Sequence, residues 1–213
     1  GIILEDDCVP NQSFFSYCQE LLIRHQHNPA VMHIGGVNLQ QGNWRGAGSY
    51  YFTRICHIWG WATWRRAWNL YDFSMSDFPQ FQRENSIQNI LTVAEDQTYW
   101  MNAFQKVYDQ QIDTWDYQWV YAVWANRGLG TLPNVNLIKN IGFDESATHT
   151  KVKDLKLGDW STGELTQIIH PTFVLEDHVA TEYSSRMLFR PKQGWEKKVD
   201  RMKLRLRHRT WYI

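Results

Sequence analysis

Short apolar runs alternate with longer amphipathic stretches along the chain up to about residue 150. The runs that predict strands cover residues 1–4, 31–34, 49–54, 129–132 and 135–138. The first run is apolar throughout, which is typical of a strand buried on both faces of a parallel sheet.

Four stretches place apolar residues at the spacings of three and four that are typical of helices. They cover residues 14–24, 62–68, 95–108 and 116–124, and Gly128 stops the last one. Strands that alternate with helices predict an α/β domain with a mainly parallel or mixed sheet over residues 1–150. Residues 151–213 form a C-terminal extension, in which residues 194–209 or so predict a basic amphipathic helix.

The composition narrows the possible classes of protein. A net charge of zero argues against a general nucleic-acid binder. No apolar run has the length of a membrane span, no signal peptide is visible, and Cys8, Cys18 and Cys56 lack metal-ligand spacing. We therefore expect reduced thiols and a cytoplasmic protein. The 12 Trp, 10 Tyr and 10 Phe residues either line a carbohydrate site or fill the core.

Three adjacent carboxylates, Glu5, Asp6 and Asp7, follow the first predicted strand. The C-terminal end of a strand is where open α/β sheets bind their ligands. Acids this close repel one another unless a cation or hydrogen-bond donors neutralise them, and carboxylate oxygens suit Mg²⁺ or Mn²⁺. The cluster is therefore a candidate metal site, although a solvated acidic turn ahead of a helix has the same pattern.

Four stretches in a fixed order carry a resemblance to a known family. They are LEDD at 4–7, HIWGWATWRR at 57–66, TWDYQW at 114–119, and NLIKNIGF at 136–143 followed by ATHT at 147–150. Together they resemble the nucleotide-diphospho-sugar transferases with a GT-A fold, in particular a bacterial hemolytic-protein-like group. The resemblance covers about residues 1–150 and implies a GT-A-like, Rossmann-related mixed sheet flanked by helices. In that family the strands that bind uridine and ribose precede the acidic motif, so the chain would be an N-terminally truncated catalytic domain with a C-terminal helical appendage.

The resemblance implies roles for the acidic cluster. An acid–any–acid motif in such enzymes holds a divalent cation, Mn²⁺ or Mg²⁺, that bridges the two phosphates of the donor. By position, Asp7 becomes the metal ligand, and Glu5 and Asp6 would reach the ribose or metal-bound waters. A late histidine often completes the metal site, which implies His149, with His170 as the alternative. A lone histidine is also a common loop residue.

Asp116 is the candidate general base. Inverting glycosyl transfer needs one carboxylate that takes the proton of the acceptor hydroxyl. Asp116 stands where a predicted helix begins, so it fits a plain N-cap as well. Glu95, Asp96 and Asp113 are rival acids, and without a base at Asp116 a retaining reaction stays open.

The segment 57–66 is expected to shape the cleft for the sugar and the acceptor. Gly60 between two tryptophans permits a tight turn, and Trp61 is the ring expected to be most exposed to a sugar face. Arg65 or Arg66 would meet a phosphate. Tryptophans at spacings of three and four fit a buried helix face equally well.

These residues predict a metal-dependent glycosyltransferase that moves a hexose or a related sugar from a nucleotide-diphosphate donor to an acceptor hydroxyl. The acceptor would be a carbohydrate or a lipid-linked sugar, as in polysaccharide biosynthesis, and Asn38 and Asn140 would orient ligand hydroxyls. The basic helix would contact the inner face of an anionic membrane or pack its apolar stripe against the domain. One alternative is a sugar-binding module without turnover, which the missing upstream strands favour. Another is a metal-independent glycoside hydrolase that uses two of the acids.

Overall fold

The structure, a computed structural model, describes residues 1–142 and 161–190. The strands are β1 (Ile2–Ile3), β2 (Cys8–Pro10), β3 (Val31–Gly35), β4 (Tyr50–Thr53), β5 (Trp61–Ala62), β6 (Leu129–Pro133) and β7 (Ile138–Asn140). The helices are α1 (Ser13–Arg24), α2 (Arg65–Trp68), α3 (Phe78–Arg83), α4 (Ala94–Tyr108), α5 (Asp116–Ala125) and α6 (His178–Leu188), with a 3₁₀ helix at Ser86–Asn89. The three longer helices expected before residue 130 are confirmed as α1, α4 and α5.

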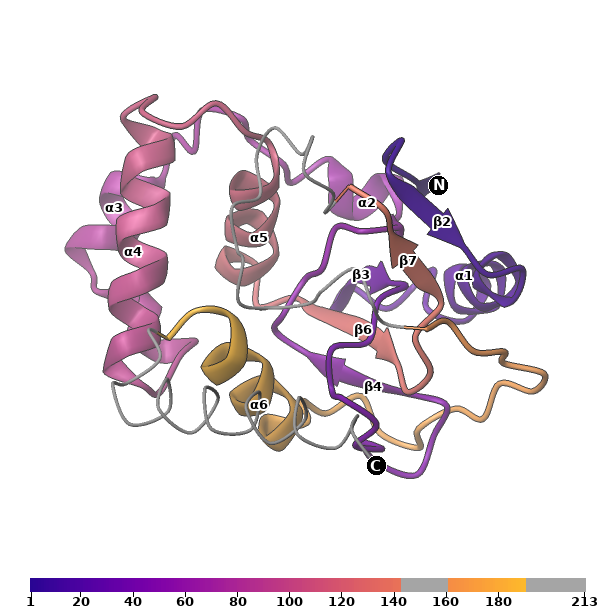
Figure 1. The fold of residues 1–213 in the computed structure, drawn as a ribbon. Helices are drawn as coiled ribbons and strands as arrows, with labels where there is room; N and C mark the ends of the chain where they lie inside the picture. Colours follow the sequence, from indigo (N-terminus) through magenta and orange to yellow (C-terminus); the bar gives the residue numbers. More distant parts are fainter. Residues whose placement is uncertain (143–160, 191–213) are drawn as a thin grey trace, which may run out of the picture.

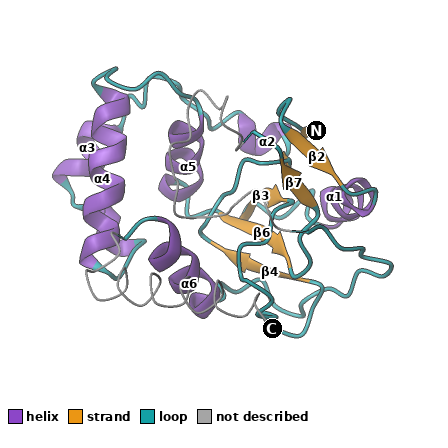
Figure 2. Ribbon diagram, viewed as in Figure 1, coloured by secondary structure: helices purple, strands orange, loops and turns teal. Residues whose placement is uncertain are grey.

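The main sheet is mixed and has the strand order β1-β5-β3-β6-β4. Figure 2 shows its strands β3, β6 and β4. β3 and β6 are parallel, whereas β1 with β5, β5 with β3, and β6 with β4 are antiparallel. β2 and β7 form a separate antiparallel pair. The protein is therefore a mixed α/β fold with a mixed sheet flanked by helices, as the alternation of strands and helices predicts.

Two apolar cores lie on the two sides of the main sheet, with α1 on one side and α3–α5 on the other (Figure 1). The two residues of β5 point to different cores: Trp61 packs with the α3–α5 side and Ala62 with the α1 side. Trp119 and Trp124 of α5 are fully buried. Most of the aromatic surplus therefore fills the core.

β1 differs from the strand that its sequence predicts. Its sheet partner in the described chain is β5, to which it runs antiparallel, so it lies at an edge and not between parallel neighbours. Ile2 is 38% exposed and Leu4 is 39% exposed. An apolar run has the same composition at an edge as at the centre of a sheet, and for this reason the sequence did not distinguish the two.

Two other predicted elements are shifted along the chain. The helix expected over residues 62–68 shrinks to α2, because the residues before it pair with β1 and β3 as β5. The strand expected over residues 135–138 lies at β7 and pairs with β2 instead of the main sheet.

Gly60 ahead of β5 has φ +63°, and a Cβ there would collide with the Ile138 side chain. The turn therefore requires glycine, as expected.

Residues 161–177 form an irregular segment, here called the strap, that runs beside β4 and leads into α6 (Figure 1). The Ser49 amide donates to the Ile169 carbonyl at 2.7 Å, and the Ile169 amide donates to Ser49 Oγ at 2.8 Å. A bridge pairs Phe52 with Glu176. The strap is held by side-chain contacts and by single backbone hydrogen bonds. For this reason its sequence shows no hydrophobic periodicity.

His149 and the basic helix expected at about residues 194–209 lie outside the described residues. Within the described ranges, no helix is both long enough and apolar enough to cross a lipid bilayer. Cys8, Cys18 and Cys56 are free thiols, as their spacing predicts.

A buried histidine, His33, joins β3 to α5. The indole nitrogen of Trp119 can only donate, so its contact to His33 Nδ1 at 3.1 Å requires an unprotonated Nδ1. Nε2 then carries the proton and donates to the His57 carbonyl at 3.0 Å. Burial lowers the pKa of His33 to about 3, and a second proton would also oppose the Trp119 donor. The fold therefore holds this imidazole neutral.

Stability should fall in mild acid because of His33. The unfolded chain protonates this residue near its usual pKa of 6.5, whereas the folded chain does so only near 3, so the unfolded state binds more protons between these values. The free energy of unfolding should drop by up to about 1.4 kcal/mol per pH unit through this window from His33 alone. Urea unfolding at several pH values measures the slope. His33→Gln, which keeps an acceptor for Trp119, should make the slope shallower by one proton; an unchanged slope would contradict the assignment.

Candidate functional site

The acidic loop between β1 and β2 brings three side chains together. The Cys8 amide donates to the Glu5 carbonyl at 3.1 Å, which closes a turn, and the Ile141 amide donates to the Asp7 carbonyl at 2.8 Å. One ligand atom each from Glu5, Asp7 and Cys8 lies within 4.8 Å of the others. A Cβ at Gly142 would collide with the Asp7 carboxylate, so glycine there makes room for this side chain.

Asp116 lies near enough to this loop for its charge to act on Glu5. The pKa of Glu5 is raised by burial first, and then by the negative charges of Asp7, Asp116 and Asp6. Asp116 therefore affects the pKa of Glu5 although the two residues are far apart in the sequence. Such a group of like charges would gain from a bound cation.

Asp116 is the first residue of α5 and is held by two donors. The Tyr117 amide donates to Oδ1 at 2.9 Å, and the Thr114 hydroxyl donates to the same oxygen. The turn is fixed further because the Gln118 side-chain amide donates to the Thr114 carbonyl at 2.7 Å. Both bonds to the carboxylate use Oδ1, so Oδ2 is the oxygen that can meet a substrate proton. Trp115 takes the N-cap position, so the plain N-cap interpretation of Asp116 is wrong by one residue.

An aromatic cavity of about 600 Å³ lies beside these acids. Its walls come from β1, β5, α2 and the turn before α5, and its lining includes Ile3, Trp61, Thr63, Trp64, Arg65, Trp68 and Trp115. Ile3 lies two residues before Glu5 and Trp115 lies directly before Asp116. Two residues of the lining are thus close in sequence to the acids, whereas the lining itself includes none of the acids.

The expectation that Trp61 is the most exposed ring is wrong. Trp61 is 1% exposed and stacks against His33 at a centroid distance of 5.3 Å and against Trp115 at 5.6 Å. Its ring faces are covered, so it supports the cavity wall and does not stack on a sugar. Trp68 is 41% exposed and stacks on Tyr71 at 4.6 Å, which keeps this more open ring in place.

The two neighbouring arginines have different environments. Arg65 is exposed and lines the aromatic cavity, which keeps it available for a phosphate. Arg66 donates to the backbone carbonyls of His25, Gln26 and Val31, and its guanidinium lies 4.4 Å from the Trp64 ring. Arg66 therefore fastens α2 to the end of α1.

Two predicted polar residues make backbone contacts. Asn38 donates to the Pro133 carbonyl at 2.6 Å and accepts from the Gln40 amide at 2.8 Å. Asn140 is 5% exposed and accepts from the Gly142 amide at 2.7 Å. These bonds shape loops, and the Asn140 bond fixes the glycine that faces Asp7.

Of the two candidate metal histidines, His170 lies far along the chain in the strap. Its Nδ1 lies 3.2 Å from the Tyr50 hydroxyl, and its Nε2 lies 3.3 Å from Glu20 Oε1. Both ring nitrogens are already in use, so His170 does not fit the role of a metal ligand. His149, as stated above, lies outside the described residues.

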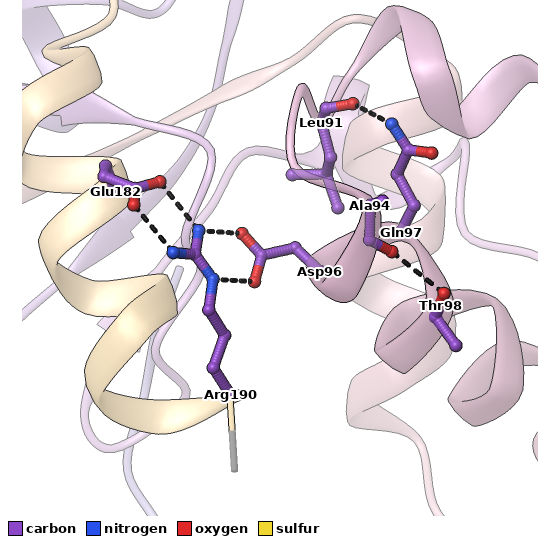
Figure 3. A network of polar contacts seen from close by, with 7 residues as sticks. All are labelled: Leu91, Ala94, Asp96, Gln97, Thr98, Glu182 and Arg190. Atoms are coloured by element: carbon purple, nitrogen blue, oxygen red, sulfur yellow. Dashed lines mark hydrogen bonds and ion pairs between the residues drawn. The ribbon is translucent and has the colours of Figure 1, made fainter. Parts of the chain in front are cut away.

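The rival acids do not join the acidic loop. Glu95 and Asp113 are exposed. Asp96 is 3% exposed and accepts two hydrogen bonds from Arg190, at 2.8 and 2.7 Å, while the same guanidinium binds Glu182 twice at 2.7 Å (Figure 3). Asp96 is thus a structural ion-pair partner that ties α4 to the end of α6.

A second cavity of about 640 Å³ lies between α4 and α6, away from the acidic loop. Three acids line it: Asp96, Glu176 and Glu182. Each is paired with an arginine, either Arg190 or Arg54. Their charges are already neutralised, so this cavity offers less chemistry than the smaller aromatic one.

Comparison with known proteins adds no relative: no family model, no curated protein and no solved structure matches the chain.

Among the residues that line the site, Thr114 and Gly142 were not singled out by sequence reasoning. Thr114 stands two residues before Asp116, and its hydroxyl donates to the Asp116 carboxylate. Gly142 gives no sequence signal for its role.

The Arg190 network provides a stability test with two carboxylates on one arginine. Asp96→Ala should lower the free energy of unfolding by about 3 kcal/mol, because it leaves a partly buried guanidinium without its inner partner. Glu182→Ala should cost under about 1 kcal/mol, because the Glu182 side chain is 51% exposed. Chemical denaturation of both variants measures the difference. Equal losses would show that the burial of Asp96 does not decide the strength of this pair.

Proposed function

We propose that the protein is a metal-dependent glycosyltransferase that moves a sugar from a nucleotide-diphosphate donor to an acceptor hydroxyl. The observation that carries this proposal is the convergence of two distant acidic motifs. Asp116 lies close enough to raise the pKa of Glu5, and Ile3 and Trp115, which are sequence neighbours of the two motifs, line one aromatic cavity. Acids, a neighbouring metal-ligand set and aromatic rings in one place fit glycosyl chemistry.

The donor set of the acidic loop fits a divalent cation. Glu5 and Asp7 supply carboxylate oxygens, which suit Mn²⁺ and Mg²⁺. Burial first, and then Asp7, raise the pKa of Cys8 to about 12, so its thiol keeps its proton and donates to Asp7 Oδ1. When bound there, such an ion would offset the negative charge that develops on the leaving nucleoside diphosphate. Gly142 leaves the space that the Asp7 carboxylate occupies, so it is a positioning residue for this set.

Asp116 acts as the general base in this proposal. Its Oδ2 takes the proton of the acceptor hydroxyl while the hydroxyl oxygen bonds to the anomeric carbon and the bond from that carbon to the diphosphate breaks. Attack from the side opposite the leaving group inverts the anomeric centre. Thr114 and the Tyr117 amide hold Oδ1, so the carboxylate keeps one orientation while Oδ2 changes its protonation state.

The aromatic cavity would bind the sugar units. Trp115 and Trp68 each stack on another ring of the protein, which leaves them rigid and costs little entropy when a sugar packs on them. Arg65 lines the same cavity and would meet a donor phosphate. A carbohydrate or lipid-linked acceptor at the cytoplasmic face of a membrane remains part of this proposal.

Glycoside hydrolysis is the second candidate, and one observation favours it. Burial and neighbouring negative charges raise the pKa of Glu5, which is a property of the general acid in glycosidases. Asp7 or Asp116 would then be the ionised partner. A hydrolase of this kind works without a metal, so metal dependence separates the two reactions.

Metal binding tests the acidic loop. Wild-type protein should bind Mn²⁺, measured by isothermal titration calorimetry and by loss of the free Mn²⁺ electron-spin signal. Asp7→Asn should weaken binding at least about tenfold, and Gly142→Ala should weaken it as well, because a Cβ at position 142 displaces Asp7. Asp113→Asn, an exposed acid near Asp116, is the matched control and should bind normally. Failure of wild-type protein to bind Mn²⁺ would rule out the metal-dependent reaction.

Turnover tests the base. With a panel of nucleotide sugars, release of the nucleoside diphosphate should require Mn²⁺. Asp116→Asn should reduce the rate by about 10²–10⁴-fold and leave Mn²⁺ affinity intact, because it preserves the oxygen that Thr114 and Tyr117 bind. Full activity of Asp116→Asn would exclude this residue as the base. Metal-independent cleavage of glycosides that is lost in Glu5→Gln would favour the hydrolase instead, and binding without any turnover would favour a sugar-binding module.

A further inference from the structure

Four polar side chains form a continuous relay from the surface into the α1 side of the core. Glu20 Oε1 lies 3.3 Å from His170 Nε2, His170 Nδ1 lies 3.2 Å from the Tyr50 hydroxyl, and that hydroxyl lies 3.1 Å from His25 Nε2. Tyr50 is 0% exposed and His25 is 5% exposed, whereas Glu20 is about half exposed. The relay joins α1, the strap and β4, and none of its members belongs to the site described above.

The direction of every proton in the relay follows from its outer end. An ionised Glu20 carboxylate can only accept, so His170 carries its proton on Nε2 and its Nδ1 accepts from the Tyr50 hydroxyl. The Tyr50 oxygen then accepts from His25 Nε2–H. At neutral pH both histidines are therefore neutral Nε2–H tautomers.

The relay is one of the attachments of the strap to the sheet. Ser49, next to Tyr50, bonds the strap through the amide and the carbonyl of Ile169 and through the Gln167 carbonyl. His170 follows directly and contacts Tyr50. The relay and the Ser49 bonds thus lie side by side at the start of β4.

The charged groups around the two histidines differ. Burial first, and then the charges of Arg24, His170 and Arg66, lower the pKa of His25 to about 4. The pKa of His170 is also lowered by burial and by Arg24, but Glu20 acts in the opposite direction. The first proton therefore belongs on His170, beside the only carboxylate of the relay, and a charge there opposes protonation of His25.

We propose that the relay is a proton-operated latch, which takes up one proton on His170 by reversing its hydrogen bonds and releases the strap from β4 when a second proton reaches His25.

The reversal conserves every hydrogen bond. A doubly protonated His170 donates from Nδ1 to the Tyr50 oxygen and from Nε2 to Glu20. The Tyr50 hydroxyl then turns to donate to His25 Nε2, so neutral His25 must move its own proton to Nδ1. After a second protonation, both histidines point N–H donors at the Tyr50 oxygen, its hydroxyl proton loses its acceptor, and two imidazolium ions lie near Arg24. The unsatisfied hydroxyl proton and the repulsion between positive charges both destabilise this arrangement. In this doubly protonated state the strap is released from β4.

Nitrogen-15 NMR of labelled histidines in the full chain tests the reversal. At pH 7.5 both His25 and His170 should show the Nε2–H tautomer. As His170 titrates, His25 should change to the Nδ1–H tautomer at the same pH while it remains neutral. A His25 tautomer that stays unchanged through the titration of His170 would overturn the proposal. Tyr50→Phe removes the connecting hydroxyl and should abolish the linked change, while His170 still titrates.

Amide hydrogen exchange tests the release. At the pH where His25 becomes charged, the Ile169 amide, which bonds Ser49, should exchange at least about tenfold faster than at neutral pH after correction for intrinsic rates. The Ile34 amide in β3 should stay protected, because the latch opens the strap alone. Ile169 and Ile34 amides that lose protection together would overturn a local latch and indicate global unfolding. Glu20→Gln removes the counter-charge and should lower the pH at which His170 titrates; an unchanged titration would also contradict the relay.

Discussion

Trp61 stacks between His33 and Trp115, and this three-ring stack fixes the geometry of the candidate site. His33 belongs to β3, Trp61 to β5, and Trp115 is the residue before Asp116. β5 pairs with β1, which leads directly to the acidic loop. The stack therefore sets the separation between the two acidic motifs, and Trp119 locks it by its bond to His33. The imidazole of His33, at one end of the stack, must be neutral, since a charged ring would oppose the Trp119 donor.

The same stack explains which parts of the site the sequence predicted. Asp116 and the acidic triplet were proposed from the resemblance and from their positions at the ends of apolar elements, and their roles stay predictions. The role of Trp61 was predicted wrongly, because spacing cannot show which of several tryptophans has its faces covered. Both faces of Trp61 are taken by residues distant in sequence, His33 and Trp115. Exposure of this kind is decided by tertiary packing alone.

The elements of the fold also differ in whether the sequence predicted them. α1 and α4 were predicted because each buries one apolar stripe whose period is visible in the sequence. α5 was predicted from apolar residues at the same spacings, although seven consecutive residues of it, 118–124, are buried. The edge position of β1 was missed, because strand neighbours are chosen by contacts between distant residues. The strap and α6 gave little signal, since single backbone bonds and side-chain contacts hold the strap against β4. Periodicity therefore predicts elements that bury a face, and not those that are fastened by individual polar contacts.

The distribution of paired and unpaired acids supports the assignment of the site. Asp96, Glu176 and Glu182 each bind an arginine, so their charges serve the fold. Within the described ranges, the acids of the loop and Asp116 have no arginine or lysine ion-pair partner, and burial of Glu5 among them raises its pKa. Unfavourable electrostatics of this kind costs stability unless a ligand relieves it. The cost falls on acids from two distant parts of the sequence, and their sequence neighbours Ile3 and Trp115 line an aromatic cavity. Charges arranged in this way are expected to serve binding and not folding.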